Sequence, residues 1–464
     1  MLSSQNVTVN GLCNNHGRTK YGIKSVTLQE VVEMQRKADI KVIVFYGSDY
    51  VKQIKHLAEE GIQECEVAVP WEQRIIFVNM DKELMEHIKT KRYMNTITFN
   101  KFNAADSNVH ALIKYIPDAY KKKYNLNIIY GKDVWNIENI VKVPLISPVT
   151  VSGFATFLYH YPKFTYNIEV CHNGVSIKAC GLMDKSDKNA GGNPQIYEKV
   201  DIVCAASHLH MIVNSSFYAI PENKYRITGS PRNDILMLAD SRLNLEKLLG
   251  ISLEGKKIIF NMPTFRVFEQ AGSVDGSAIL DDSFKIQNFD YDEFNDFLKK
   301  HNLICVSKIH HGEETTVFNK TKERNFDSIF VVTNWELEKY GLDLYEVLGA
   351  GDLLITDYST IYNDFLFMNK PTIFVITDIE EYRKNRGLAL EPYDFWSAGP
   401  KVNSQQELQQ EILKCLNDFN YYKDERERLR PVFFKYLDTN SIQRTWKVID
   451  EAMTQVQNNE IFSN

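Results

Sequence analysis

The sequence predicts an α/β fold in which two Rossmann-like, doubly wound domains face each other across a cleft. Short apolar runs alternate with amphipathic stretches along most of the chain, which is typical of buried parallel strands separated by helices. This alternation restarts after Pro221, which indicates two such units in tandem. In an arrangement of this kind a ligand binds between the units, at the carboxyl ends of both sheets.

The first unit is predicted to span residues 21–217 and to follow a loose, polar segment at residues 1–20. No Gly-rich dinucleotide turn follows its early strands, which argues against dinucleotide binding. The expected strands are KVIVFYG (41–47), RIIFVN (74–79), YNIEVC (166–171) and DIVCAAS (201–207). The expected helices include SDYVKQIKHLAEEGI (48–62), HLHMIVNSSF (208–217) and the second half of VTVSGFATFLYHY (149–161), after a strand.

The second unit is predicted to span residues 218–430, and helices at 431–464 are expected to cross back and brace the first unit. Polar, Gly-rich segments at 184–197 and 268–290 are expected to form functional loops, the second of them over the cleft. The expected strands are KYRIT (224–228), KKIIFN (256–261), LICVSK (303–308), SIFVVT (328–333), DLLIT (352–356) and TIFVI (372–376).

The stretch 351–376 predicts a strand, a tight turn, a helix and a second strand. Ser359 or Thr360 is expected to cap the helix, and Lys370-Pro371 is expected to end it. A turn from the carboxyl end of a strand into a helix offers backbone N–H groups and a positive dipole end. The sequence therefore predicts an anion site here, with two hydroxyl groups added to it.

Composition limits the classes of function. The net charge is −6, with 25% charged and 44% hydrophobic residues, so general nucleic-acid binding is not expected. No run reaches the roughly 18 apolar residues that span a bilayer, and the N-terminus lacks a signal pattern, so we expect a cytoplasmic protein. The seven cysteines form no CxxC pair, which argues against a disulfide framework and a zinc site.

Residues 106–135 include DAYKKKYNLNIIYGKDVW, in which lysines stand among aromatic and aliphatic residues. These residues favour a solvated helix face followed by a strand. The alternative is a docking patch for anionic lipid.

Five short motifs follow predicted strands, and each has an ordinary structural explanation when taken alone. In CHNGVSIKACG (171–181), His172 has the residue type of a general base, or it is simply satisfied within a turn. In RITGSPRNDIL (226–236), Arg232 is placed to contact a diphosphate beside a helix start that Asn233 or Asp234 caps. The alternative is a surface turn.

In NMPTFR (261–266), Thr264 and Arg266 are placed to contact phosphate or ribose. The motif SKIHHGE (307–313) supplies three basic side chains, and the absence of a suitably spaced carboxylate argues against a metal site there. In TDYSTIYNDF (356–365), Asp357 and Asp364 either hold hydroxyl groups of a ligand or cap the helix. Basic groups from both units that converge on one cleft of an acidic protein indicate an anionic donor. No P-loop or kinase signature supports ATP-dependent transfer.

The ordered series H-N-G…K, G-S-P-R-N-D, P-T-F-R, K-I-H and T-D-Y-S-T…D-F resembles the CDP-glycerol glycerophosphotransferase family over residues 150–400, most strongly over 225–375. The segment KPTIFVITDIEEYRKNRGL (370–388) extends the likeness, which implies a fold of the GT-B type. By motif match, His172 takes the place of the family's acceptor-side histidine, the base for the acceptor hydroxyl, and His310 that of the second histidine, near the donor diphosphate. The resemblance and the motifs together give these donor-binding candidates: Asn173, Gly174, Lys178, Ser230, Arg232, Asn233, Thr264, Arg266, Lys308, His311, Asp357, Ser359, Thr360 and Asp364.

Two departures concern the acceptor half. The family pattern W-H-G-T-P-L-K is C-H-N-G-V-S-I-K here, with one residue added between His172 and Gly174, and His311 stands where the family has proline. We therefore expect a different acceptor or polyol. The first 140 residues show no clear match.

The sequence thus predicts a transferase that moves glycerol phosphate or ribitol phosphate from a CDP-polyol to a hydroxyl of a glycan or of a growing teichoic-acid or capsule-like polymer, and releases CMP. The resemblance implies peripheral attachment to the inner face of the membrane. No cofactor besides the CDP-polyol substrate is expected, and a need for divalent metal is left open.

Two alternatives are a GT-B glycosyltransferase that uses a nucleotide-sugar and a non-catalytic module that binds polyol phosphate or nucleotide. For the glycosyltransferase, a ribose-binding carboxylate would come from Asp357, Asp364, Glu380 or Glu381. The sequence does not indicate an oligomeric state.

Overall fold

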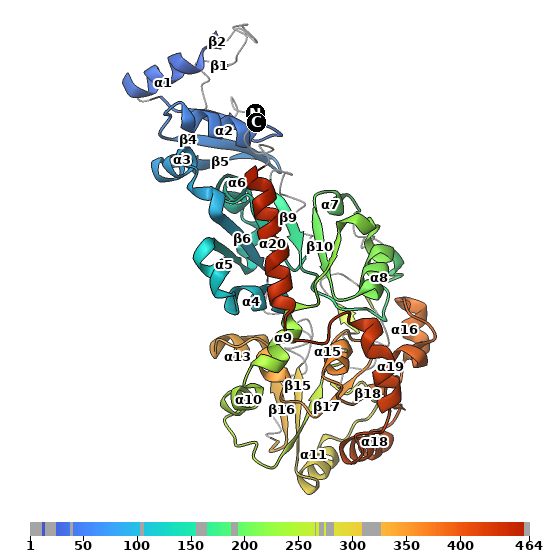
Figure 1. Cartoon of the computed structure of the whole chain (residues 1–464). Helices are drawn as coiled ribbons and strands as arrows, with labels where there is room; N and C mark the ends of the chain where they lie inside the picture. Colours follow the sequence, from blue (N-terminus) through green and yellow to red (C-terminus); the bar gives the residue numbers. More distant parts are fainter. Residues whose placement is uncertain are drawn as a thin grey trace.

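The chain folds into two lobes, each built on a parallel six-stranded sheet, with a small three-stranded sheet beyond the first lobe (Figure 1). The computed structural model describes residues 12–13, 25–37, 40–102, 106–154, 165–186, 194–264, 266–268, 273–274, 283–308 and 326–458. Most of the two predicted functional loops, and the predicted helix within 149–161, lie outside these residues. None of the helices in the described part is long and apolar enough to cross a membrane.

The sheet of the first lobe has the strand order β11-β10-β9-β8-β6-β7, and every neighbouring pair is parallel. The inner strands β8 and β10 are short and wholly buried, as expected for a sheet covered on both faces. The bounds are β6 Thr96–Lys101, β7 Asn125–Tyr130, β8 Val149–Ser152, β9 Tyr166–Glu169, β10 Ile202–Ala205 and β11 Tyr225–Ile227.

The strand β11 corrects the predicted division of the chain. Residues 224–228 were expected to open the second unit, but β11 pairs with β10, with Val203 opposite Tyr225. The chain therefore completes the first sheet before it crosses to the second lobe at Gly229, whose φ of +83° favours glycine. The predicted boundary at residues 217 and 218 falls inside the first lobe.

The sheet of the second lobe has the order β16-β15-β12-β17-β18-β19 and is parallel throughout. Five strands predicted for the second unit form this sheet, and the edge strand β19 is an addition. The bounds are β12 Lys257–Asn261, β15 Leu303–Lys308, β16 Ile329–Val332, β17 Leu353–Thr356, β18 Thr372–Val375 and β19 Lys401–Val402.

The small sheet corrects a second expectation. The segments predicted as strands at 41–47 and 74–79 form β3 (Ile43–Phe45) and β5 (Arg74–Met80), on either side of β4 (Cys65–Trp71), which was not predicted. Because β4 and β5 run antiparallel, this part of the chain is a mixed sheet with its own apolar core and not a half of a Rossmann-like sheet. Two-stranded pairs also join β1 (Leu12–Cys13) to β2 (Ser25–Val26) and β13 (Val267–Phe268) to β14 (Ser273–Val274).

Helices cover the sheets. Those in the first part of the chain are α1 Leu28–Lys37, α2 Tyr50–Glu59, α3 Lys82–Lys89, α4 Ser107–Lys114, α5 Asp118–Lys123, α6 Ile137–Ile146, α7 Pro194–Glu198 and α8 His208–Tyr218. Those that follow β11 are α9 Pro231–Leu238, α10 Ser241–Leu249, α11 Tyr291–Lys300, α13 Asn334–Lys339, α14 Tyr345–Leu348, α15 Tyr362–Phe367, α16 Ile379–Asn385, α17 Tyr393–Trp396, α18 Gln405–Asn417, α19 Lys423–Phe433 and α20 Ser441–Asn458.

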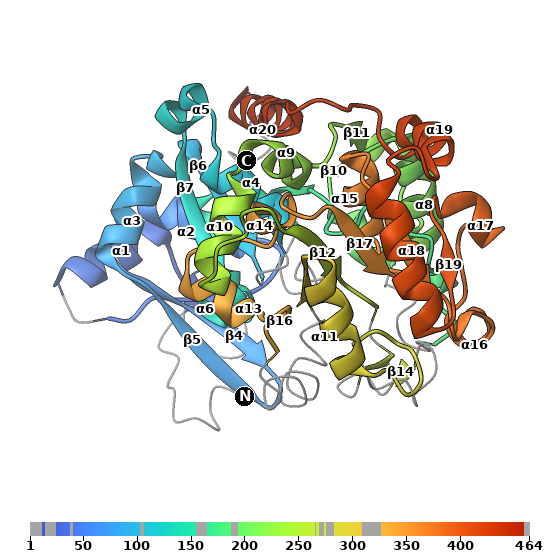
Figure 2. The same ribbon diagram turned by 90° about the horizontal axis from the view of Figure 1, so that it is seen from below.

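The last helix, α20, leaves the second lobe and packs on the first, between α5 and α9 (Figure 2). Trp446 is fully buried there, donates its indole N–H to the carbonyl of Leu112, and stacks with Tyr120. Asp450 accepts hydrogen bonds from Lys123 and Tyr124. The helix α20 therefore ties the two lobes together.

The lobes also meet where α4 of the first contacts α14 of the second. Ser107 donates a hydrogen bond to Asp343, and the ammonium of Lys114 lies 2.7 Å from Glu346. Tyr115 donates to the same carboxylate. Burial raises the pKa of Glu346, but hydrogen bonds from His110 and Lys114 outweigh it and lower that pKa to about 2.

This contact predicts a loss of stability in acid. The contacts of Glu346 favour the carboxylate, so its contribution is complete above the unfolded pKa of about 4.5 and is lost as the pH falls towards 2. When the pH falls from 5 to 3, we expect the free energy of unfolding to decrease by about 1 kcal/mol more in the wild-type chain than in the Glu346→Gln variant. This value is lower than the full effect of the pKa shift because solvent screens the partly exposed Lys114. Urea unfolding followed by circular dichroism measures this, and equal pH dependences of both chains would contradict it.

Candidate active site

His172 lies just beyond the carboxyl end of β9. Cys171 has a φ of +39°, unusual for a residue with a side chain, and turns the chain there. The backbone N–H of His172 donates to the carbonyl of Gly153 after β8, at 2.8 Å, and its ring stacks on Phe154 with centroids 4.3 Å apart. The side chain is 26% exposed, so a substrate can reach a ring whose backbone is fixed.

Two residues that sequence reasoning missed position this histidine. Asp106, at the start of α4, is buried, and its Oδ1 lies 3.9 Å from His172 Nδ1. The Nδ2 of Asn108 donates to the carbonyls of Val170 and Cys171, which fixes the end of β9. Neither residue belongs to a recognisable local motif, so only the fold brings them to the site.

Gly153 stands where the backbone passes close to Asp106. A Cβ atom at this position would lie 2.5 Å from Asp106 Oδ1, well inside van der Waals contact. The absence of a side chain therefore lets the carboxylate approach the His172 ring.

Arg232 connects the His172 loop to the second lobe. Its Nη1 donates to the carbonyl of His172 at 2.6 Å, its Nη2 donates to Asp364, and its backbone N–H donates to Asn108. The side chain is buried, with its guanidinium over the ring of Tyr345. Burial lowers the pKa of Arg232, but the carboxylate of Asp364 outweighs this and raises it. Arg232 therefore fixes the loop through contacts on both lobes, and its predicted diphosphate contact stays a prediction.

Asp364, on α15, accepts three kinds of donor. Besides Arg232, the amide of Asn233 donates to it at 2.8 Å and the hydroxyl of Tyr345 at 2.7 Å. The predicted helix-capping roles are therefore wrong for Asn233 and for Asp234, whose carboxylate instead accepts the N–H of Ile442 in α20. Ser230 occupies the N-cap position of α9 without a side-chain hydrogen bond.

The segment after His172 continues this contact between the lobes. A Cβ on Gly174 would lie 2.4 Å from the amide nitrogen of Asn363, which donates to the carbonyl of Val175. Lys178 forms a backbone bridge with Leu388 in the second lobe. Asn173 is half-buried beside His172, and the two residues line one small cavity. This part of the predicted site is thus brought together.

Thr264 and Arg266 form a second cluster with Asp357 from the 356–365 motif. Arg266 is 1% exposed and bonds to the carboxylates of Asp357 and Asp378 and to the carbonyl of Thr264. Asp357 also accepts the N–H and hydroxyl of Thr264, both at 2.8 Å. Arg266 and Asp357 therefore pair with each other in the structure, and their contacts to a donor stay predictions.

Three further candidates lie at the carboxyl edge of the second sheet. Lys308 ends β15. Ser359 and Thr360 follow β17, which β12 separates from β15, and both are half-buried. The predicted caps are wrong, because Ile361 is the N-cap of α15 and no side chain caps that helix. His310 and His311 lie outside the described residues, so their positions stay predictions.

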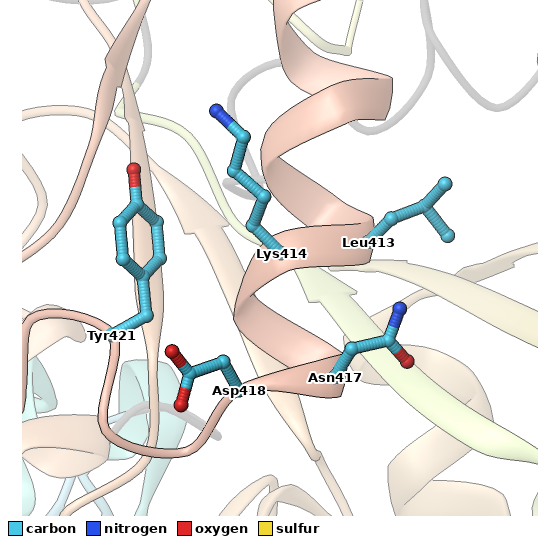
Figure 3. A pocket seen from close by; sticks show the side chains of 5 residues that line it. All are labelled: Leu413, Lys414, Asn417, Asp418 and Tyr421. Carbon is cyan, nitrogen blue, oxygen red and sulfur yellow. The ribbon is translucent and has the colours of Figure 1, made fainter.

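The pockets that adjoin the described residues include a small one and a larger one. One, of about 80 Å³, opens beside His172. The other, of about 390 Å³, lies at the end of α18 and includes none of the predicted site residues (Figure 3). In the described parts of the chain, no three His, Cys, Asp or Glu side chains are grouped as metal ligands.

The geometry can support general base chemistry at a junction between lobes. A partly exposed imidazole beside a buried carboxylate is suited to accept a proton from a hydroxyl group. The second sheet brings one lysine and two hydroxyl groups to its carboxyl edge, where α/β proteins bind nucleotides.

Comparison with known proteins agrees with the motifs. The chain is 25% identical to the teichoic acid ribitol-phosphate polymerase TarL of Staphylococcus aureus, over 70% of this chain and 56% of that protein. It is 26% identical to a teichoic acid glycerol-phosphate primase of Bacillus subtilis, over 61% of this chain and 68% of the primase. The chain thus spans only about half the length of its TarL-type relatives, and 41% in the case of TarK.

The fold is similar to that of the wall teichoic acid polymerase TagF, with a TM-score of 0.62 and 18% identity, over 82% of this chain and 94% of the TagF chain. This likeness, together with the two parallel sheets, confirms the predicted two-domain α/β fold of the GT-B type. The model of the CDP-Glycerol:Poly(glycerophosphate) glycerophosphotransferase family matches residues 83–451. The chain therefore belongs to this family.

Proposed function

We propose that the protein transfers a polyol phosphate unit, glycerol phosphate or ribitol phosphate, from its CDP derivative to a hydroxyl of a teichoic-acid-like or capsule-like polymer. The observation that carries the proposal is the position of His172. Its backbone is fixed by Gly153 and by Arg232, which is itself paired with Asp364 of the second lobe, while its ring stays open to substrate. Family membership over residues 83–451 supports the donor class.

In this reaction His172 accepts the proton of the acceptor hydroxyl. The hydroxyl oxygen bonds to the phosphorus that carries the polyol, the bond from that phosphorus to the bridging oxygen of the diphosphate breaks, and CMP leaves. Asp106 orients the ring and stabilises the imidazolium, because its buried carboxylate lies beside Nδ1.

Lys308, Ser359 and Thr360 contribute positive charge and hydroxyl donors to the diphosphate from the carboxyl edge of the second sheet. His310, which follows β15 in sequence, is assigned to the same diphosphate by its motif.

Measuring CMP release tests the proposal. The purified chain is incubated with CDP-glycerol or CDP-ribitol and with short glycerol-phosphate or ribitol-phosphate oligomers. We expect CMP release that depends on the oligomer. Turnover of a UDP-sugar or GDP-sugar, without CMP from either CDP-polyol, would favour a glycosyltransferase. Donor binding without any turnover would favour a binding module.

We further propose that the protein acts in the cytoplasm, at the inner face of the membrane, and that α5 contacts anionic lipid. Lys121 and Lys122 are exposed on this helix, whereas Lys123 is paired with Asp450. Each exposed lysine near an anionic surface adds about 1 kcal/mol of attraction.

Co-sedimentation with phosphatidylglycerol vesicles checks this proposal. The double variant Lys121→Glu/Lys122→Glu is expected to lose most of its binding at physiological salt. The matched double variant Lys299→Glu/Lys300→Glu on α11 is expected to bind like the wild type. Equal binding by all three chains would exclude α5 as the contact.

A further inference from the structure

The small cavity beside His172 differs from a typical phosphate-binding site in the side chains that line it. It has a volume of about 80 Å³ and lies within the first lobe, between the end of β9, the segment after β8, and the helices α7 and α8. His172 forms one wall of it. Whatever occupies the cavity therefore lies against the proposed base.

Apart from His172, the polar side chains among the described residues that line the cavity are neutral or negative. Glu169 and Asn214 are 5% and 6% exposed, and the rings of Tyr197 and Tyr218, which also line the cavity, have centroids 5.1 Å apart. Burial, with the nearby charge of Glu169, raises the pKa of both phenols, so they stay protonated and can donate hydrogen bonds. None of the described residues that line the cavity is a lysine or an arginine.

These walls disfavour a phosphate and suit a hydroxyl group. A phosphate beside the Glu169 carboxylate would meet like-charge repulsion, and no lysine or arginine among the described lining residues would offset it. A polyol hydroxyl can donate to that carboxylate and accept from a phenol or an amide. The apolar surface of Phe154 and Ile196 is available to the carbon chain of a polyol.

We propose that this cavity is the subsite for the neutral, hydroxyl-bearing end of the acceptor, and that it holds one hydroxyl against His172. The inference rests on the proposed transfer function and adds to it the part of the acceptor that is recognised. It also predicts that the acceptor's phosphate groups lie outside the cavity.

Kinetics of three variants test the subsite. The donor is held at saturation and the acceptor is di(glycerol phosphate) or di(ribitol phosphate), whichever gives faster CMP release from the wild type. Tyr197→Phe and Asn214→Leu each remove hydrogen-bonding groups from the cavity wall, so we expect the KM for acceptor to rise about 3- to 10-fold. The KM for CDP-polyol is expected to stay within twofold. Tyr130→Phe, at an exposed tyrosine on β7, is the matched control and should leave both constants unchanged.

The outcomes separate the subsite from the proposed function. The subsite would be overturned if Tyr197→Phe and Asn214→Leu both kept the wild-type KM for acceptor. It would also be overturned if these variants raised the KM for donor and not the KM for acceptor. A wild-type chain that releases no CMP with either dimer would overturn the proposed function. Because Asn214 also donates to the thiol of Cys171, melting temperatures verify that each variant is folded. Wild-type crystals soaked with the dimer give a readout without variants, and its terminal polyol must lie between Tyr197 and Asn214.

Discussion

Replacing His172 with alanine is expected to lower the kcat for CMP release by about 10²- to 10⁴-fold, the usual contribution of a general base. The Kd for CDP-glycerol is expected to change by less than about threefold. The reason is structural, since Arg232 contacts the backbone carbonyl of His172 and not its ring, so the loop stays in place without the imidazole. Rapid-quench assays of CMP and calorimetric titration with the donor measure the two effects separately.

The matched control is His208→Ala, which removes an exposed histidine from the start of α8. This variant should turn over like the wild type. If His172→Ala also kept its kcat within tenfold of the wild type, another group would have to accept the acceptor's proton, and the proposed role of His172 would be wrong.

Replacing Arg266 with methionine is expected to lower the free energy of unfolding by about 3–5 kcal/mol. The substitution leaves two buried carboxylates, Asp357 and Asp378, without their shared cation. It also removes the guanidinium that lies near the rings of Tyr358 and Tyr382. Urea unfolding of the purified variant measures the loss.

The control for Arg266 is Arg383→Met, because Arg383 also pairs with two carboxylates, Glu380 and Glu391, but is about one-third exposed. Solvent screens such a pair, so we expect a loss of less than 1 kcal/mol. An Arg266→Met chain of wild-type stability with a strongly raised KM for donor would restore the donor contact suggested by the sequence and refute the structural role.

The second sheet was predictable from sequence because each of its inner strands is a short, uninterrupted apolar run between turn residues. The strand β17 shows this, since 353–356 is fully buried and Asp352 and Asp357 bound it. In contrast, β11 is a three-residue edge strand, and nothing in Tyr225–Ile227 says which sheet it joins. Its partner β10 is fixed by tertiary packing, which a local pattern does not contain.

The same distinction applies to the site. The position of His172 after a strand follows from local sequence. The roles of the arginines do not, because their partners are remote: Asp364 lies 132 residues from Arg232, and Asp378 lies 112 residues from Arg266. A buried arginine beside a carboxylate and an exposed arginine awaiting a phosphate have the same local sequence, and only burial and ion pairing separate them.

The most direct test of the central claim, that one CDP-polyol is bound between the two lobes, is a crystal structure of the protein with CDP-glycerol. We expect the phosphorus that carries glycerol to face His172 and the diphosphate to contact Ser359, Thr360 and Lys308. Donor bound at another place, such as the pocket at the end of α18 (Figure 3), with the junction between the lobes empty, would contradict the claim.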